Sequence, residues 1–241
     1  MFIEIYGFGR SGHHAMIQWL IKNITGEQYE RTNQKLKTLP HHSLMYINEG
    51  NLSQHVTEEY LRDYGSNYNK IIISYEDSLS NHTVLTDNNI CKVDNSIENE
   101  HLIHFKQSKR FFFIRDFFNN ISSRHIRNKF NGNERFMVNE RFIELWKGHA
   151  YSILEDNQPF LKYEDWLLSK QKRNNFITSL LSHGELYDNK NIHGTHSSFN
   201  NNDYLNRFKE SDFTKEHLDM IYSDRDLEYV IKEMGYEYKK R

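Results

Sequence analysis

Short runs of β-branched and aromatic residues alternate along this chain with segments whose apolar residues recur at helical spacing. Strands are predicted over residues 2–6, 70–75, 110–114 and 159–163. The runs KIIISY and RFFFI are too continuously apolar for strands with one solvent-exposed face. Runs of this kind are typical of central strands in a parallel sheet.

Helical spacing first appears directly after the first run. Apolar residues from Ala15 to Ile21 form one face of a helix, and residues 23–26 mark its end. Further helices are predicted over residues 117–130 and 138–153, and another follows the fourth strand and ends at about residue 181. After a polar stretch from 183 to 206, two last helices are predicted over residues 215–222 and 227–234.

Alternating strands and helices predict an α/β fold with a doubly wound, mainly parallel sheet. Ligands of such sheets bind at the carboxyl ends of the strands. We therefore expect the loops after Tyr6, Tyr75, Ile114 and Tyr163 to meet at one crevice.

A glycine-punctuated loop, Gly7 to Gly12, joins the first strand to the first helix. Its backbone N–H groups and the helix N-terminus can bind an anion. His13 and His14 stand where nucleoside triphosphatases carry Lys and Ser/Thr. Without those two residues the loop favours a phosphorylated ligand that needs no metal, although an ordinary glycine turn is the alternative.

A second anion site is predicted at the end of the third run. Arg115 follows the strand, and Ser123 lies one to two turns into the next helix, so both side chains can face one anion. A guanidinium donates two hydrogen bonds to a phosphate and a hydroxyl adds a third. The alternative is a strand-end salt bridge from Arg115 to Asp116 or Asp165.

The sequence from Gly9 to His14 resembles the 5′-phosphosulfate loop of PAPS-dependent sulfotransferases. The resemblance implies that Arg10 takes the family's basic role and that Ser11, Gly12, His13 and His14 take the loop roles around the 5′-phosphate and the sulfuryl group. His13 and His14 differ from the usual threonines. It also implies PAPS as donor, 3′,5′-ADP as product, and no metal.

Other segments resemble the same family in the same order. Arg115 and Ser123 match its 3′-phosphate motif, although Phe117 and Phe118 replace the usual Pro and basic residue. Residues 161–166 resemble an architectural strand-and-turn segment. The late loop, with Ser198 and Arg207, resembles one that folds over the nucleotide.

The resemblance implies a His or Glu as general base just beyond the strand that precedes the 3′-phosphate strand, and Glu76 directly follows that strand here. The competing candidates are His14 and the pair His41 and His42. Glu76 could also pair with Arg10 or cap a turn.

Composition narrows the remaining possibilities. The 241 residues predict a single sulfotransferase-like domain over 1–241, and a net charge of −2 disfavours nucleic-acid or membrane partners. A single cysteine, Cys91, and the absence of a long apolar run predict a cytoplasmic protein without an internal disulfide or a membrane anchor.

The acceptor is the least defined partner. The sequence predicts a hydroxyl or amine, on a carbohydrate or small molecule, and does not predict an oligomeric state. Two alternatives stay open, an atypical P-loop kinase or NTPase and a non-catalytic nucleotide-binding protein.

Overall fold

The computed structural model describes residues 2–26, 36–39, 44–48, 70–77, 108–132, 136–155, 157–181, 183–188 and 207–240. Contacts within the chain define two compact units that interleave in sequence. The first comprises Met1–Gly7 and Thr32–Phe112, and the second comprises Phe8–Arg31 and Phe113–Arg241. The single domain expected over 1–241 stays a prediction.

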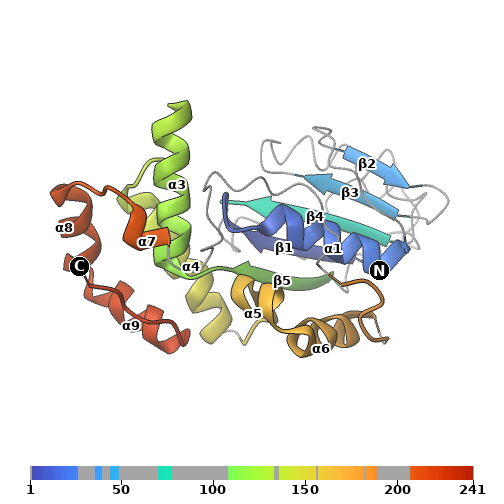
Figure 1. Cartoon of the computed structure of the whole chain (residues 1–241). Helices are drawn as coiled ribbons and strands as arrows, with labels where there is room; N and C mark the ends of the chain where they lie inside the picture. Colours follow the sequence, from blue (N-terminus) through green and yellow to red (C-terminus); the bar gives the residue numbers. More distant parts are fainter. Residues whose placement is uncertain are drawn as a thin grey trace, which may run out of the picture. The chain divides into compact units, whose positions relative to one another are not determined.

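The first unit is built on a mainly parallel sheet (Figure 1). Its strands are β1 (Phe2–Gly7), β2 (Leu36–Leu39), β3 (Leu44–Asn48), β4 (Lys70–Glu76) and β5 (Ser108–Ile114), whose last two residues belong to the second unit. They lie in the order β2-β3-β4-β1-β5. The pairs β3–β4, β4–β1 and β1–β5 are parallel, whereas β2 runs antiparallel to β3.

Cross-strand pairs hold the register of the three central strands. Tyr6 of β1 lies opposite both Tyr75 and Phe112, and its ring stacks on theirs with centroids 4.9 and 5.1 Å apart. Glu4 is completely buried and accepts a hydrogen bond at 2.9 Å from Nε of Arg110, its partner on β5. A buried charge is tolerated because its counter-charge lies directly opposite.

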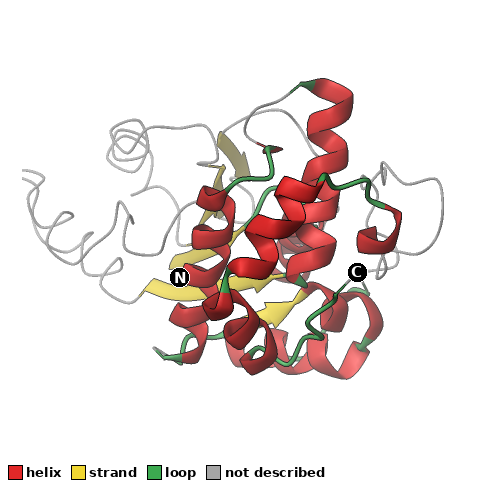
Figure 2. Ribbon diagram, turned by 90° about the vertical axis from the view of Figure 1, so that its left-hand side faces the viewer, coloured by secondary structure: helices red, strands yellow, loops and turns green. Residues whose placement is uncertain are grey.

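The second unit is mostly helical (Figure 2). It contains α1 (His13–Thr25), α3 (Phe117–Asn131), α4 (Glu140–Leu154), β6 (Phe160–Lys162), α5 (Tyr163–Leu168), α6 (Lys170–Leu181), α7 (Arg207–Glu210), α8 (Lys215–Ser223) and α9 (Arg225–Glu233). Side-chain caps begin five of these helices, from Asp116, Asn139, Ser169, Thr214 and Asp224. Each cap accepts a backbone N–H that the first helical turn cannot satisfy.

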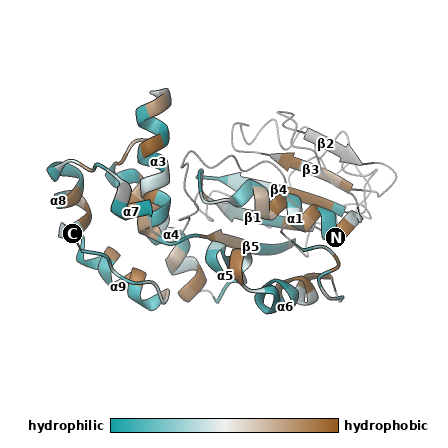
Figure 3. Ribbon diagram, viewed as in Figure 1, coloured by the Kyte–Doolittle hydropathy of each residue, from teal (hydrophilic) through white to brown (hydrophobic). Residues whose placement is uncertain are grey.

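Amphipathic helices supply the core of the second unit. α9 carries buried Leu227, Val230 and Ile231 among charged residues, so hydrophobic and hydrophilic colours alternate along it (Figure 3). The rings of Phe117 and Trp146 join α3 to α4 in an edge contact with centroids 5.5 Å apart. Burial of such large rings provides much of the packing energy.

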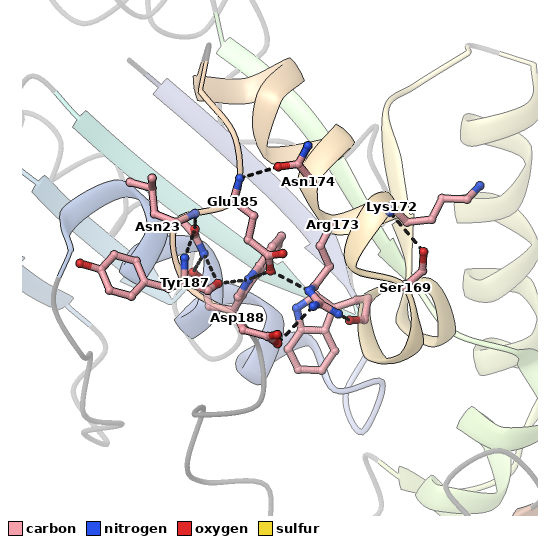
Figure 4. Close-up of polar contacts among 11 residues, drawn as sticks. Asn23, Ser169, Lys172, Arg173, Asn174, Glu185, Tyr187 and Asp188 are labelled. Atoms are coloured by element: carbon pink, nitrogen blue, oxygen red, sulfur yellow. Dashed lines mark hydrogen bonds and ion pairs between the residues drawn. The ribbon is translucent and has the colours of Figure 1, made fainter.

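A buried polar network ties residues 183–188 to α1 and α6 (Figure 4). Arg173 donates to carboxylate oxygens of Glu185 at 2.6 Å and Asp188 at 3.1 Å. The indole N–H of Trp19 donates to the same Glu185 oxygen, and Asn23 Oδ1 accepts the backbone N–H of Tyr187 at 3.0 Å. Direct ion pairs therefore balance the charge of Arg173.

The predicted α/β class, the mainly parallel sheet and the loop after the first strand are confirmed. The pattern did not predict β2, β3 or the four-residue α7, and it merged α5 with α6, which are separated at Ser169. No helix in the described part of the chain is long and apolar enough to cross a membrane.

Candidate anion-binding site

The loop after β1 forms a tight turn. The backbone N–H of Ser11 donates to the carbonyl of Phe8 at 3.1 Å, and the Ser11 hydroxyl donates to the same oxygen at 2.7 Å. Arg10 lies within the turn at φ 67°, in the left-handed region that residues with a Cβ seldom adopt. Strain of this kind persists only where surrounding contacts enforce it, and it often marks a binding site.

Gly12 ends the loop and precedes α1 at φ 85°. A Cβ at this position would lie 2.2 Å from Cε2 of the Tyr163 ring. Both the backbone conformation and the ring therefore require glycine here. The residues expected to be architectural, 161–166, thus include one that packs directly on the loop.

Arg115 reaches the loop from the end of β5. Its side chain is 2% exposed, and its Nη1 donates to the carbonyl oxygen of Arg10 at 3.1 Å. Its guanidinium carbon also lies 4.6 Å from the centroid of the Tyr163 ring. Arg115, Tyr163 and the loop therefore form one cluster. Of the loops expected to meet, those after β1 and β5 contribute residues to it, whereas Tyr163 belongs to α5, which begins directly after β6.

Ser123 is paired with Arg207, which begins α7. Nη1 of Arg207 donates to the Ser123 hydroxyl at 2.9 Å, and the backbone N–H of Arg207 donates to Oδ1 of Asn119 at 3.0 Å. Ser123 and Arg207 are 1% and 5% exposed. The structure thus joins two residues that the sequence assigned separately to nucleotide binding.

The two histidines begin α1. His13 is buried and His14 is half-buried, and their rings stack with centroids 5.2 Å apart. No cluster of three or more histidine, cysteine or acidic side chains suited to a metal ion occurs among the described residues.

Two acidic residues lie beside Arg115, the buried Asp116 and the half-buried Glu164. Asp116 caps α3 by accepting the Asn119 N–H at 2.8 Å, and it pairs with Lys239 at 3.3 Å. Glu164 accepts the Tyr236 hydroxyl at 3.1 Å. Burial raises the pKa of both carboxyl groups, while the nearby charge of Arg115 acts to lower them.

The phenol of Tyr236 is buried against the same carboxylates. Burial raises the pKa of Tyr236 well above its ordinary value, so the hydroxyl keeps its proton and donates a hydrogen bond to Glu164. The Lys239 pair attaches the C-terminal segment to the start of α3, and the contact of Tyr236 attaches it to α5.

Glu76 belongs to the first unit. It is the last residue of β4 and lies opposite Gly7, the last residue of β1. The strand ends there, because Asp77 adopts φ 59° and donates its N–H to the Gly7 carbonyl at 3.0 Å. Glu76 therefore occupies the carboxyl end of the sheet, as predicted.

Ser198, His41 and His42 lie outside the described residues. Two residues that sequence reasoning did not assign contact the loop, Tyr163 and Arg124. Arg124 directly follows Ser123 in the motif, which was the only sequence signal for it. Gly12 gave a weaker signal for Tyr163, since an obligatory glycine can mark a close approach.

No family model matches the sequence, and no curated protein matches it. Two solved structures are similar to this chain. The sulfotransferase domain from the curacin biosynthetic pathway is 14% identical with a TM-score of 0.45, over 99% of this chain and 98% of that chain. The sulfotransferase domain from the Synechococcus PCC 7002 olefin synthase is 13% identical with a TM-score of 0.48, over 99% and 95%.

Proposed function

We propose that this protein is a PAPS-dependent sulfotransferase. The loop with Arg10, Ser11 and Gly12, together with the start of α1, holds the 5′-phosphosulfate of the donor. Arg115, Ser123 and Arg207 hold its 3′-phosphate. The supporting observation is that both motifs meet in the second unit: Arg115 contacts the loop across 105 positions, and Arg207 contacts Ser123 across 84.

The chemistry of the loop suits this donor. Left-handed residues at Arg10 and Gly12 give the concave backbone that binds anions, and the N-terminus of α1 adds a positive dipole. Arginine has five N–H donors, so a guanidinium that holds the loop can also contact a phosphate. His13 and His14 replace the residues that a metal-dependent triphosphatase needs.

Transfer proceeds by attack of the acceptor oxygen or nitrogen on the sulfur atom. The bond between sulfur and the 5′-phosphate oxygen breaks, and its electron pair leaves with 3′,5′-ADP. Arg10 and the loop amides stabilise the charge that grows on the leaving oxygen. The proton lost by the acceptor passes to a general base, and Glu76 is our candidate because it ends β4 at the carboxyl end of the sheet.

The test is transfer of labelled sulfate from PAPS to a panel of hydroxyl and amine acceptors, carbohydrates included, with EDTA present. We expect transfer to at least one acceptor and no stimulation by Mg²⁺. A protein that binds 3′,5′-ADP but transfers label to no acceptor would instead be a nucleotide-binding protein without this activity.

Glu76→Gln tests the base separately. Turnover should fall by about 10²- to 10⁴-fold with donor affinity unchanged, because the amide keeps the shape but cannot take the proton. Asp77→Asn is the matched control, since asparagine tolerates the left-handed conformation of that residue, and it should retain turnover. Normal turnover in Glu76→Gln would show that Glu76 is not the general base. The candidates for that role would then be His14, His41 and His42.

A further inference from the structure

Arg124 is a buried arginine on α3 for which the proposed donor site has no role. Its side chain is 3% exposed. The guanidinium carbon lies 4.4 Å from the centroid of the Phe142 ring and 5.3 Å from that of Phe136. Aromatic faces attract a guanidinium and fix its plane without cancelling its charge.

The guanidinium is directed at the loop. Its Nη1 donates a long hydrogen bond, 3.5 Å, to the carbonyl oxygen of Gly9, and the charge of the guanidinium also attracts the carbonyl dipole. The next carbonyl, that of Arg10, receives Nη1 of Arg115. Two arginines therefore hold consecutive carbonyl groups of the same turn.

The turn depends on such contacts. The hydrogen bond from Ser11 N–H to the Phe8 carbonyl closes it, and Arg10 takes a left-handed conformation inside it. In a turn of four residues, the orientation of the central peptide decides whether the third residue adopts a positive φ. Here that central peptide joins Gly9 to Arg10, and it carries the carbonyl that faces Arg124.

We propose that Arg124 is a positioning residue that holds the Gly9–Arg10 peptide in the orientation the anion-binding loop requires. The described peptide bonds are all trans, so the N–H of Arg10 points away from the Gly9 carbonyl and hence away from Arg124. This N–H then belongs to the concave side of the loop. The inference rests on the proposed function only in taking the donor's phosphosulfate as the anion.

Amide hydrogen exchange of the unliganded protein, followed by NMR, tests the effect on the loop. Arg124→Met keeps an unbranched side chain against the rings and removes the cation. We expect the Ser11 amide to exchange about tenfold faster in this variant, because its turn opens more often, while the amides of α9 keep their rates. Arg124→Lys, which keeps the charge without the planar fork, should give an intermediate rate and decides the matter if Arg124→Met does not fold.

Calorimetry with inorganic pyrophosphate tests the consequence for binding. Arg124→Met should bind this probe about tenfold more weakly. Arg173→Met is the matched control, because Arg173 is equally buried in the same unit but is held by Glu185 and Asp188. In its folded state it should leave pyrophosphate affinity within about twofold of wild type.

Wild-type exchange at Ser11 in both Arg124 variants overturns the proposal, even if pyrophosphate binds more weakly, because Arg124 would then contact the anion directly. If wild-type protein does not bind pyrophosphate, the loop does not bind phosphate groups as the proposed function requires. The exchange rates still decide whether Arg124 orders that loop, so the two failures are distinct.

Discussion

Two kinds of contact hold buried arginines of the second unit: carboxylates hold Arg173, whereas loop carbonyls and aromatic rings hold Arg115 and Arg124. Arg173, 3% exposed, donates to two carboxylates and to the backbone carbonyl of Trp166 (Figure 4). Arg115 and Arg124 are as deeply buried, but they donate to the carbonyls of the loop and stack on aromatic rings.

This difference separates a structural site from the proposed binding site. Carboxylates at ion-pair distance cancel the charge of a guanidinium and occupy its donors, so Arg173 stabilises the fold. Carbonyl groups and aromatic rings hold Arg115 and Arg124 against the loop, so these side chains order the turn that we propose binds the donor.

The largest expected effect is on stability, at the ion-paired site. Arg173→Met should lower the free energy of unfolding by about 3–5 kcal/mol, because it leaves the buried carboxylate of Glu185 uncompensated. Urea unfolding measures the change. Adding Glu185→Gln should recover part of the loss, and affinity for 3′,5′-ADP should stay unchanged in the folded variants. A large loss of 3′,5′-ADP affinity in the folded Arg173 variants would contradict the distinction between the two kinds of contact.

A smaller effect is expected on ligand binding, at the loop. Gly12→Ala should weaken 3′,5′-ADP binding about 100-fold, because the added methyl group meets the Tyr163 ring and the left-handed backbone disfavours a Cβ. In a Tyr163→Ala background only the backbone penalty remains, so the loss should shrink to about tenfold.

Gly132→Ala is the matched control for that experiment. Gly132 follows α3 at φ 61°, and no described heavy atom comes within 4 Å of a Cβ built there. It should cost stability without changing affinity. An equal loss of affinity in both variants would show that the contact between Gly12 and Tyr163 has no special role.

The sequence predicted the parts of this site that depend on local pattern. The apolar run of β1, the glycines after it and the helical spacing of α1 are all local, and so is Arg115 at a strand end. The roles of Arg124 and Tyr163 depend on contacts with the loop across more than a hundred positions. Spacing along the chain carries no information about such contacts.

The short elements were not predicted from the sequence for a different reason. β2, with four residues, and β3, with five, are too short for a periodic signal, and their partners come from the sheet. Similarly, the four residues of α7 are held by the bonds of Arg207 to Asn119 and Ser123. No glycine or proline marks the break between α5 and α6 at Ser169.

The smallest expected effect is on pH dependence, and it concerns Asp116 beside Arg115. Burial raises the pKa of the Asp116 carboxyl in the folded protein. The stability that the protonated carboxyl contributes is therefore complete below its pKa in the unfolded chain, and it is lost as the pH rises through its pKa in the folded protein. Asp116→Asn keeps the helix cap but cannot ionise. Urea unfolding should show the variant gaining stability relative to wild type between pH 4 and pH 7. A gain by wild type over that range would mean that the pair with Lys239 outweighs burial.

The central claim is that one nucleotide bridges the loop and the Ser123–Arg207 pair. Calorimetry with 3′,5′-ADP, 5′-AMP and ATP with Mg²⁺ tests it directly, in wild type and in Ser123→Ala. We predict tight, EDTA-insensitive binding of 3′,5′-ADP, weaker binding of the other two, and a loss in Ser123→Ala of about tenfold for 3′,5′-ADP but not for 5′-AMP. Tighter binding of ATP with Mg²⁺ than of 3′,5′-ADP would contradict the claim. So would an equal loss of affinity for 3′,5′-ADP and 5′-AMP in Ser123→Ala.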